Sequence, residues 1–289
     1  MALFLVDGTY ELFRAYFGAP PKTAPDGREI GAVRGVVASL LGMLRHEGAT
    51  HVGVATDHVI ESFRNDLFPH YKTGEGMDPR LYDQFPILED LLRAAGFVVW
   101  AMVEFEADDA IAAAAHKFDA EAPAIRLATV DKDLAQCVRG ERVIMVDRRR
   151  KQTLDEKGVK AKFGVPPALI PDWLALVGDS ADGYPGIPGW GAKTAAAVLS
   201  VHGPIEAIPD DPSAWRATVR GKETIAAALA ARREEAMLYK RLATLRTDAP
   251  IPETLAELEW KGPRPGGEAL FSSLGLDDLF ARYAAAARP

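Results

Sequence analysis

Four apolar, strand-like runs each end on a carboxylate, and this recurrence is the strongest chemical signal in the chain. The acids are Asp7 after residues 3–6, Asp57 after 51–56, Glu104 and Glu106 after 97–103, and Asp131 after 125–130. The carboxyl ends of parallel strands meet at one edge of a sheet, where ligands bind in open α/β folds. Acids gathered there repel one another unless cations lie between them. The pattern therefore predicts a site for more than one metal ion.

Two short clusters add further acids to this edge. Glu106, Asp108 and Asp109 place three carboxylates in four residues where a helix is expected to begin. Helix capping explains one such acid but does not require three. Asp131-Lys132-Asp133 repeats the arrangement after the next strand, where a solvated turn is an equally good explanation of this motif alone. Clustered aspartates suit Mg²⁺. The spacings typical of zinc sites, CxxC, HxxxH and HExxH, do not occur.

A glycine-rich segment in the second half of the chain predicts phosphate binding. Residues 186–191 read Gly-Ile-Pro-Gly-Trp-Gly and precede a helix-like stretch, which is a helix–hairpin–helix pattern. Gly186, Gly189 and Gly191 let backbone N–H groups approach a phosphate, and Lys193 adds positive charge. Such contacts hold a nucleic-acid backbone without reading bases. Two more acids, Asp179 and Asp182, lie just upstream.

Overall charge does not identify the partner. The 289 residues carry a formal charge of −7 from 34 basic and 41 acidic side chains. Setting aside the acids named above except Glu104, nine in all, leaves 32 acidic side chains and hence a charge of +2. The single cysteine, Cys137, excludes an intramolecular disulfide framework and indicates a cytoplasmic location. No stretch approaches the ~18 apolar residues of a membrane span, so we expect no membrane association.

The chain is predicted to form two parts. Residues 1–164 alternate strands and helices, which is typical of a mostly parallel sheet flanked by helices. The expected helices are 8–17, 31–46, 79–95 and 108–118, and a further strand is expected at 142–146. Residues 165–289 read as a helical subdomain punctuated by proline and glycine. Residues 63–80 form a polar, aromatic loop close to Asp57, and loops of this kind are often functional.

Together these motifs resemble the bacterial 5′→3′ exonuclease and flap-endonuclease family, which includes the N-terminal nuclease region of DNA polymerase I. The likeness covers nearly the whole chain. Within the family, the chain resembles the stand-alone members. It is carried by residues 5–8, 63–64, 106–109, 131–133, 178–182 and 242–245. The resemblance implies a PIN-like nuclease domain with a helical arch near 63–86. It also implies a helix-three-turn-helix near 171–202 that grips the DNA duplex.

The resemblance further implies the roles of individual residues. Two Mg²⁺ ions, for which Mn²⁺ can substitute, would be held by Asp7, Asp57, Glu106, Asp108, Asp109, Asp131, Asp133, Asp179 and Asp182. Lys72 matches the arch lysine and is expected to be catalytic together with Asp7, Asp109 and Asp131. DNA contacts are expected from Arg64, Tyr71, Lys72, the hairpin glycines and Lys193. Phe13 stands where relatives stack an aromatic ring on a base, although core packing explains this residue equally well.

The expected function is hydrolysis of DNA at 5′ single-strand/duplex junctions during replication and repair, leaving 5′-phosphate and 3′-hydroxyl ends. A monomer is expected, with K⁺ bound at the hairpin and a DNA polymerase as functional partner. Two positions depart from the family pattern: Glu75 where relatives carry arginine, and Val130 where they carry glycine. Two alternatives remain. One is a PIN-type ribonuclease, and the other is a DNA-junction-binding protein without activity.

Overall fold

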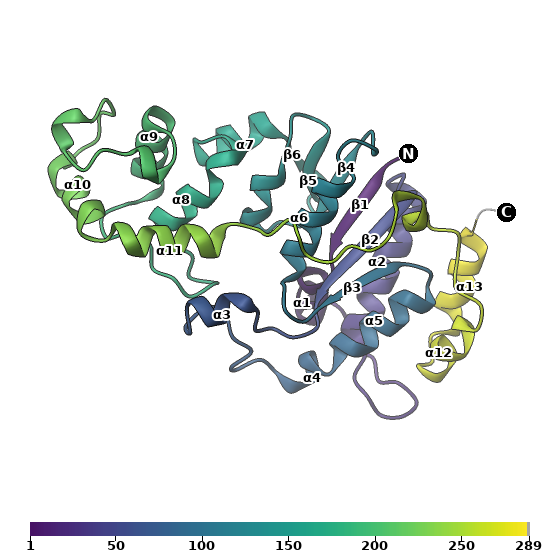
Figure 1. Ribbon diagram of the computed structural model, residues 1–289. Coiled ribbons are helices and arrows are strands. Elements are labelled where there is room, and N and C mark those ends of the chain that lie inside the picture. The colour runs from purple at the N-terminus through teal and green to yellow at the C-terminus, as the bar shows by residue number, and fades with distance from the viewer. Residues whose placement is uncertain (288–289) are drawn as a thin grey trace. The chain divides into compact units, whose positions relative to one another are not determined.

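The computed structural model describes residues 1–287, which form two compact units (Figure 1). The first unit contains residues 1–60, 74–129 and the chain from 247 onwards. The second contains residues 61–73 and 130–246. The units therefore interleave along the chain, whereas the sequence predicts two consecutive parts that meet at residue 164.

The first unit is built on four parallel strands in the order β3-β2-β1-β4. Their bounds are β1 Leu3–Asp7, β2 His51–Asp57, β3 Val98–Met102 and β4 Ile125–Ala128. These are the four runs that the sequence predicts as strands, so the mostly parallel α/β class is confirmed. The strand β4 ends two residues early because the Thr129 N–H turns back to the Leu127 carbonyl at 3.0 Å.

Helices cover the sheet because successive strand side chains point to opposite faces. Phe4 and Val6 of β1 join the main core cluster, to which helices α2, α5 and α13 contribute. The helix α6 packs against β1, β2 and β3. The helices of this unit are α1 Gly8–Gly18, α2 Gly31–His46, α4 Pro79–Tyr82, α5 Gln84–Ala94, α6 Ala107–Lys117, α12 Gly267–Ser273 and α13 Asp277–Ala286. The helix expected over 79–95 is thus two helices separated at Asp83.

The second unit is mainly helical. Its helices are α3 Phe63–Leu67, α7 Glu156–Phe163, α8 Ile170–Val177, α9 Ala192–His202, α10 Lys222–Ala231 and α11 Arg233–Ala243. The expected strand at 142–146 is β5 Val143–Asp147, which pairs antiparallel with β6 Gln152–Leu154. The helix α8 packs against α9 and α11. Among residues 1–287, no helix is both long enough and apolar enough to span a bilayer.

The connection from α8 to α9 is a compact turn that depends on two glycines. Gly178 has φ +87°, and a Cβ there would approach the Pro185 carbonyl carbon to 2.5 Å. Gly186 has φ +71°, and a Cβ there would lie 2.4 Å from the Gly178 nitrogen. Between them, Asp179 and Tyr184 exchange two backbone hydrogen bonds of 2.9 and 3.1 Å. Any larger residue at either glycine would push the two backbone segments apart.

Candidate metal centre

The first unit places two of the predicted acids at the ends of neighbouring strands. Asp7 ends β1 and is 5% exposed. Its Oδ1 accepts the Tyr10 N–H at 2.8 Å, and its Oδ2 accepts the Thr129 hydroxyl at 2.9 Å. Asp57 ends β2, and its Oδ1 accepts the Ala107 N–H at 2.7 Å. This bond ties the end of β2 to the first turn of α6, so the carboxylates of the strand ends are held in place by backbone and hydroxyl groups.

The acids at the start of α6 form a capping box. Glu106 is the N-cap, and its N–H donates to Asp109 Oδ2 at 3.0 Å. Asp109 is fully buried, whereas Asp108 is half-buried. Capping therefore accounts for contacts of both Glu106 and Asp109. The capping box therefore fixes the positions of the Glu106 and Asp109 carboxylates at the start of α6.

The second unit brings three of the predicted acids together. Asp133, Asp179 and Asp182 each place one ligand oxygen within 4.8 Å of the others. Asp133 and Asp179 are buried, and Asp133 Oδ1 has no hydrogen-bond partner among the described residues. Burial, followed by the charges of Asp131 and Asp182, raises the pKa of Asp133 well above its usual range. A buried carboxylate oxygen without a partner, beside two further carboxylates, fits a divalent cation such as Mg²⁺.

Asp131 lies beside this trio but is exposed. Its Oδ1 accepts the Asp133 N–H at 2.9 Å and so caps the 3₁₀ turn over Lys132–Cys137. For Asp131, the structure thus agrees with the solvated turn that the sequence allowed as an alternative explanation of this motif. Asp133 is the acid of this pair that points into the cluster.

Two residues at the site, Lys132 and Tyr184, were not predicted as functional. Lys132 forms an ion pair with Asp179. Burial would lower the pKa of Lys132, but the hydrogen bond to Asp179 and the neighbouring carboxylates raise it. Tyr184 is buried, its hydroxyl has no partner among the described residues, and burial together with Asp133 raises its pKa. Only the position of Lys132 between two acids gave any signal in the sequence.

The segment that carries Lys72 is bonded to the loop of the trio. Asn65 accepts the Ser62 N–H at 2.8 Å and donates to the carbonyls of Tyr71 and Lys72 at 3.0 and 3.2 Å. The Lys72 N–H in turn donates to the Asp182 carbonyl at 3.1 Å. The backbone of the expected catalytic lysine is therefore fixed to a residue of the carboxylate trio.

Arg64 is buried, with 1% of its surface exposed. Its Nε donates to the Leu242 carbonyl at 2.7 Å and its guanidinium also donates to the Thr244 carbonyl at 3.2 Å. These carbonyls belong to the C-terminal end of α11, which lacks intrahelical donors. The contacts favour a structural role for Arg64. Tyr71 is 3% exposed, and the DNA contacts of both residues stay predictions.

Replacing Arg64 by leucine is expected to lower the free energy of unfolding by roughly 3 kcal/mol, because the buried Leu242 carbonyl and the partly buried Thr244 carbonyl lose their donor. Urea denaturation followed by circular dichroism measures this loss. Arg64→Lys, which restores one donor, should recover part of the stability. A loss below about 1 kcal/mol for Arg64→Leu would show that the α11 carbonyls find other partners.

The hairpin offers an open backbone surface. A Cβ at Gly189 or Gly191 would meet nothing within 4 Å, in contrast to Gly186. Gly191 is the N-cap of α9, and Lys193 lies exposed in the first turn of this helix. The arrangement leaves N–H groups and one cation accessible at a helix N-terminus, as phosphate binding requires.

Phe13 packs against the core of the first unit, as one of the two explanations of this residue expects. Its ring lies edge-on to Phe85 with centroids 6.2 Å apart, and it packs against the main core cluster. The exposed aromatic residue of α1 is Phe17, which is 81% exposed and which the sequence did not single out. Base stacking by Phe13 stays a prediction.

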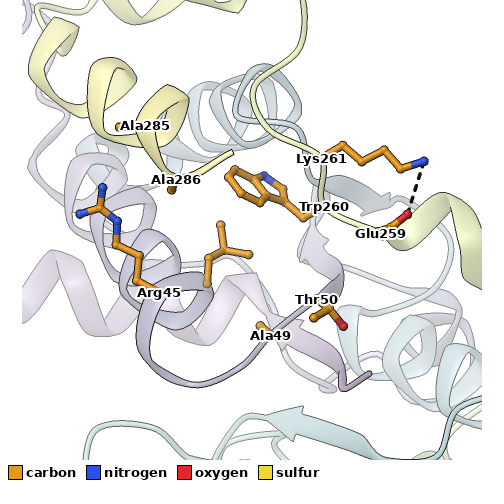
Figure 2. Close-up of a pocket in the computed structure, with 9 residues that line it drawn as sticks. Arg45, Ala49, Thr50, Glu259, Trp260, Lys261, Ala285 and Ala286 are labelled. Atoms are coloured by element: carbon orange, nitrogen blue, oxygen red, sulfur yellow. Dashed lines mark ion pairs between the residues drawn. The ribbon is translucent and has the colours of Figure 1, made fainter. Parts of the chain in front are cut away.

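Another pocket lies away from the strand-end acids (Figure 2). It has a volume of about 610 Å³ and is lined by Trp260, Arg45 and Lys261, among others. Ala49 and Thr50, which also line it, precede β2, whereas Asp57 ends that strand. The pocket is therefore at the amino end of β2 and is not part of the acidic site. A hollow of about 430 Å³ does border the trio, lined by Asp179, Gly183 and Tyr184 among others.

Comparisons with known proteins cover most of the chain. Residues 2–164 match the family model of the 5′-3′ exonuclease N-terminal resolvase-like domain, and residues 165–266 match that of the 5′-3′ exonuclease C-terminal SAM fold. The chain is 31% identical to the 5′-3′ exonuclease of Aquifex aeolicus over 90% of this chain and 87% of that protein. It is 36% identical to DNA polymerase I of Pseudomonas aeruginosa over 89% of this chain, but it spans only 28% of that relative's length.

Solved structures share the fold. A T5 5′-exonuclease with divalent zinc ions bound superposes with a TM-score of 0.71 at 18% identity, covering 99% of this chain and 98% of that one. The catalytic core of Rad2 in complex with DNA substrate gives a TM-score of 0.64 at 11% identity, covering 98% and 92%. The fold of this chain therefore occurs in solved structures, and its sequence matches known family models. The residues matched include the strand-end acids, the carboxylate trio and the glycine turn before α9. The chain belongs to the 5′-3′ exonuclease family.

Proposed function

We propose that this chain is a structure-specific 5′→3′ exonuclease and 5′-flap endonuclease that hydrolyses DNA phosphodiesters with the help of two divalent metal ions. The observation that carries the proposal is the carboxylate trio of Asp133, Asp179 and Asp182 within a member of this family. Support also comes from solved structures of the same fold, namely a T5 flap endonuclease in complex with DNA and metal ions and the catalytic core of Rad2 in complex with DNA substrate.

In this proposal the acids form two metal-binding groups. Asp7, Asp57, Glu106, Asp108 and Asp109 form the first group, and Asp131, Asp133, Asp179 and Asp182 form the second. Bound divalent ions would activate a water molecule and stabilise charge on the leaving oxygen. Thr129 orients the Asp7 carboxylate through its hydroxyl. Mg²⁺ is the proposed ion, and Mn²⁺ offers the same oxygen-ligand chemistry.

Other residues of the chain bind and orient the DNA. Lys72 would offset negative charge that develops on the scissile phosphate. A phosphate of the duplex, remote from the bond that is cleaved, would be bound by Lys193 and by the backbone around Gly186, Gly189 and Gly191. K⁺ bound by hairpin carbonyls would fix this turn. We also propose that the protein is a cytoplasmic monomer and cooperates with a DNA polymerase in replication and repair.

A 5′-labelled flap substrate tests the function. We expect Mg²⁺-dependent cleavage near the junction, abolished by EDTA, with flaps and nicked duplexes preferred over single strands. The products should carry 5′-phosphate and 3′-hydroxyl ends. Equal cleavage of single-stranded RNA without junction preference would favour the PIN-type ribonuclease. Junction binding without Mg²⁺-dependent cleavage would favour the non-catalytic alternative.

A further inference from the structure

Lys132 lies in an unusual position within the second unit. It stands between Asp131 and Asp133 in the chain, yet its ammonium pairs with Asp179, which is 47 residues away. Its side chain is 34% exposed, whereas that of Asp179 is 5% exposed. The lysine therefore reaches from the protein surface into the carboxylate trio.

The trio needs positive charge in the absence of metal. Three carboxylates whose oxygens lie within 4.8 Å of one another repel, and they do so most strongly at Asp133 and Asp179, which are buried. One of them, Asp133, also has a buried oxygen without a hydrogen-bond partner. The ammonium of Lys132 offsets part of this charge. It does so by occupying the Asp179 carboxylate, which is one of the groups that a divalent ion would use.

We propose that Lys132 is an exchangeable cation that occupies Asp179 in the metal-free protein and is displaced when a divalent ion binds the trio. This inference rests on the proposed function, because it requires a metal at Asp133, Asp179 and Asp182. Lysine suits the role because its charge is compact and its four-carbon stem is flexible. Since the side chain is partly exposed, its ammonium can move into water when the ion takes the carboxylate.

The exchange has two measurable consequences. Lys132 competes with the ion, so its presence weakens metal affinity. Lys132 also stabilises the metal-free fold, because it offsets charge that would otherwise remain buried. A lysine that merely shapes the site would have the opposite effect on affinity, since its loss would disorder the carboxylates.

Mn²⁺ binding to the full chain, followed by electron paramagnetic resonance of the free ion, tests the proposal. We expect Lys132→Met to bind Mn²⁺ at the trio about tenfold more tightly than the unsubstituted protein, because a competing charge is removed. Lys132→Arg should bind Mn²⁺ more weakly, because a guanidinium holds a carboxylate through two parallel hydrogen bonds. The exposed Lys157→Met on α7 removes a charge elsewhere in the same unit and should leave the affinity unchanged.

Thermal unfolding gives an independent measurement. In EDTA, Lys132→Met should melt below the unsubstituted protein, and it should gain more in melting temperature when Mn²⁺ is added. If Lys132→Met folds only with Mn²⁺, its affinity is measured after it has folded in the presence of Mn²⁺. Lys132→Arg still tests the proposal, because it is expected to bind Mn²⁺ more weakly than the unsubstituted protein. Weaker or equal Mn²⁺ binding by Lys132→Met, or tighter binding by Lys132→Arg, would overturn the proposal.

Asp182→Asn separates failure of this inference from failure of the proposed function. If it leaves Mn²⁺ binding unchanged, the trio binds no metal, and both the exchange and the proposed second metal group are wrong. If Asp182→Asn weakens binding but Lys132→Met does not tighten it, the metal group stands and only the exchange is wrong.

Discussion

Replacing Asp179 and Asp182 together by asparagine is expected to lower the rate of flap cleavage by roughly a thousandfold or more, the scale of losing a bound metal. Asparagine keeps the size of the side chain and part of its hydrogen bonding but removes the negative charge that a divalent ion needs. Asp179 and Asp182 each place an oxygen within 4.8 Å of an Asp133 oxygen. With both replaced, Asp133 is the one carboxylate of the trio that remains. Single-turnover cleavage at saturating enzyme measures the loss.

Junction binding by this double variant should survive or tighten. The backbone at Gly189 and Gly191 is unchanged, and less negative charge repels the phosphates. The matched control is Glu234→Gln with Glu235→Gln, which removes two charges from exposed positions in the first turn of α11. Near-normal Mg²⁺-dependent cleavage by the Asp179→Asn/Asp182→Asn variant would exclude the two-metal assignment and leave these acids as part of a DNA-binding loop.

Replacing Lys72 by alanine is expected to lower single-turnover cleavage by roughly tenfold to a thousandfold, the scale of losing one positioned charge in the transition state. The backbone N–H of Lys72 bonds to the Asp182 carbonyl and its carbonyl accepts from Asn65. Alanine keeps both bonds, so the substitution removes the ammonium and leaves the segment in place. The affinity for DNA should change much less, because many other phosphate contacts remain.

A fall in affinity that matches the fall in rate would identify Lys72 as a tether for DNA. Glu75→Arg is the companion variant, since it restores the charge common in the family three residues after the lysine. It should strengthen flap binding if this segment contacts DNA. An unchanged dissociation constant for Glu75→Arg would argue against such contact.

The sequence alone located the elements that carry the acids. Strand-like runs that end at Asp7 and Asp57 are the strands β1 and β2, and the helix expected over 31–46 is α2. The hairpin glycines also predicted the turn between α8 and α9, and the structure shows that one of them, Gly186, lies where two backbone segments approach closely. These features depend on local periodicity and on backbone conformation, which neighbouring residues in the chain largely determine.

The tertiary structure decided which side chains meet. The donors of Arg64 reach carbonyls that lie 178 and 180 residues away in the chain, a contact that no local pattern indicates. Lys132 meets Asp179 across 47 residues of the chain, and the Lys72 N–H meets the Asp182 carbonyl across 110 residues. The division of the chain into interleaved units likewise depends on where residues 61–73 pack. Such contacts arise from long-range packing, and a local pattern of charge and polarity is the same whether a side chain faces solvent or a buried partner.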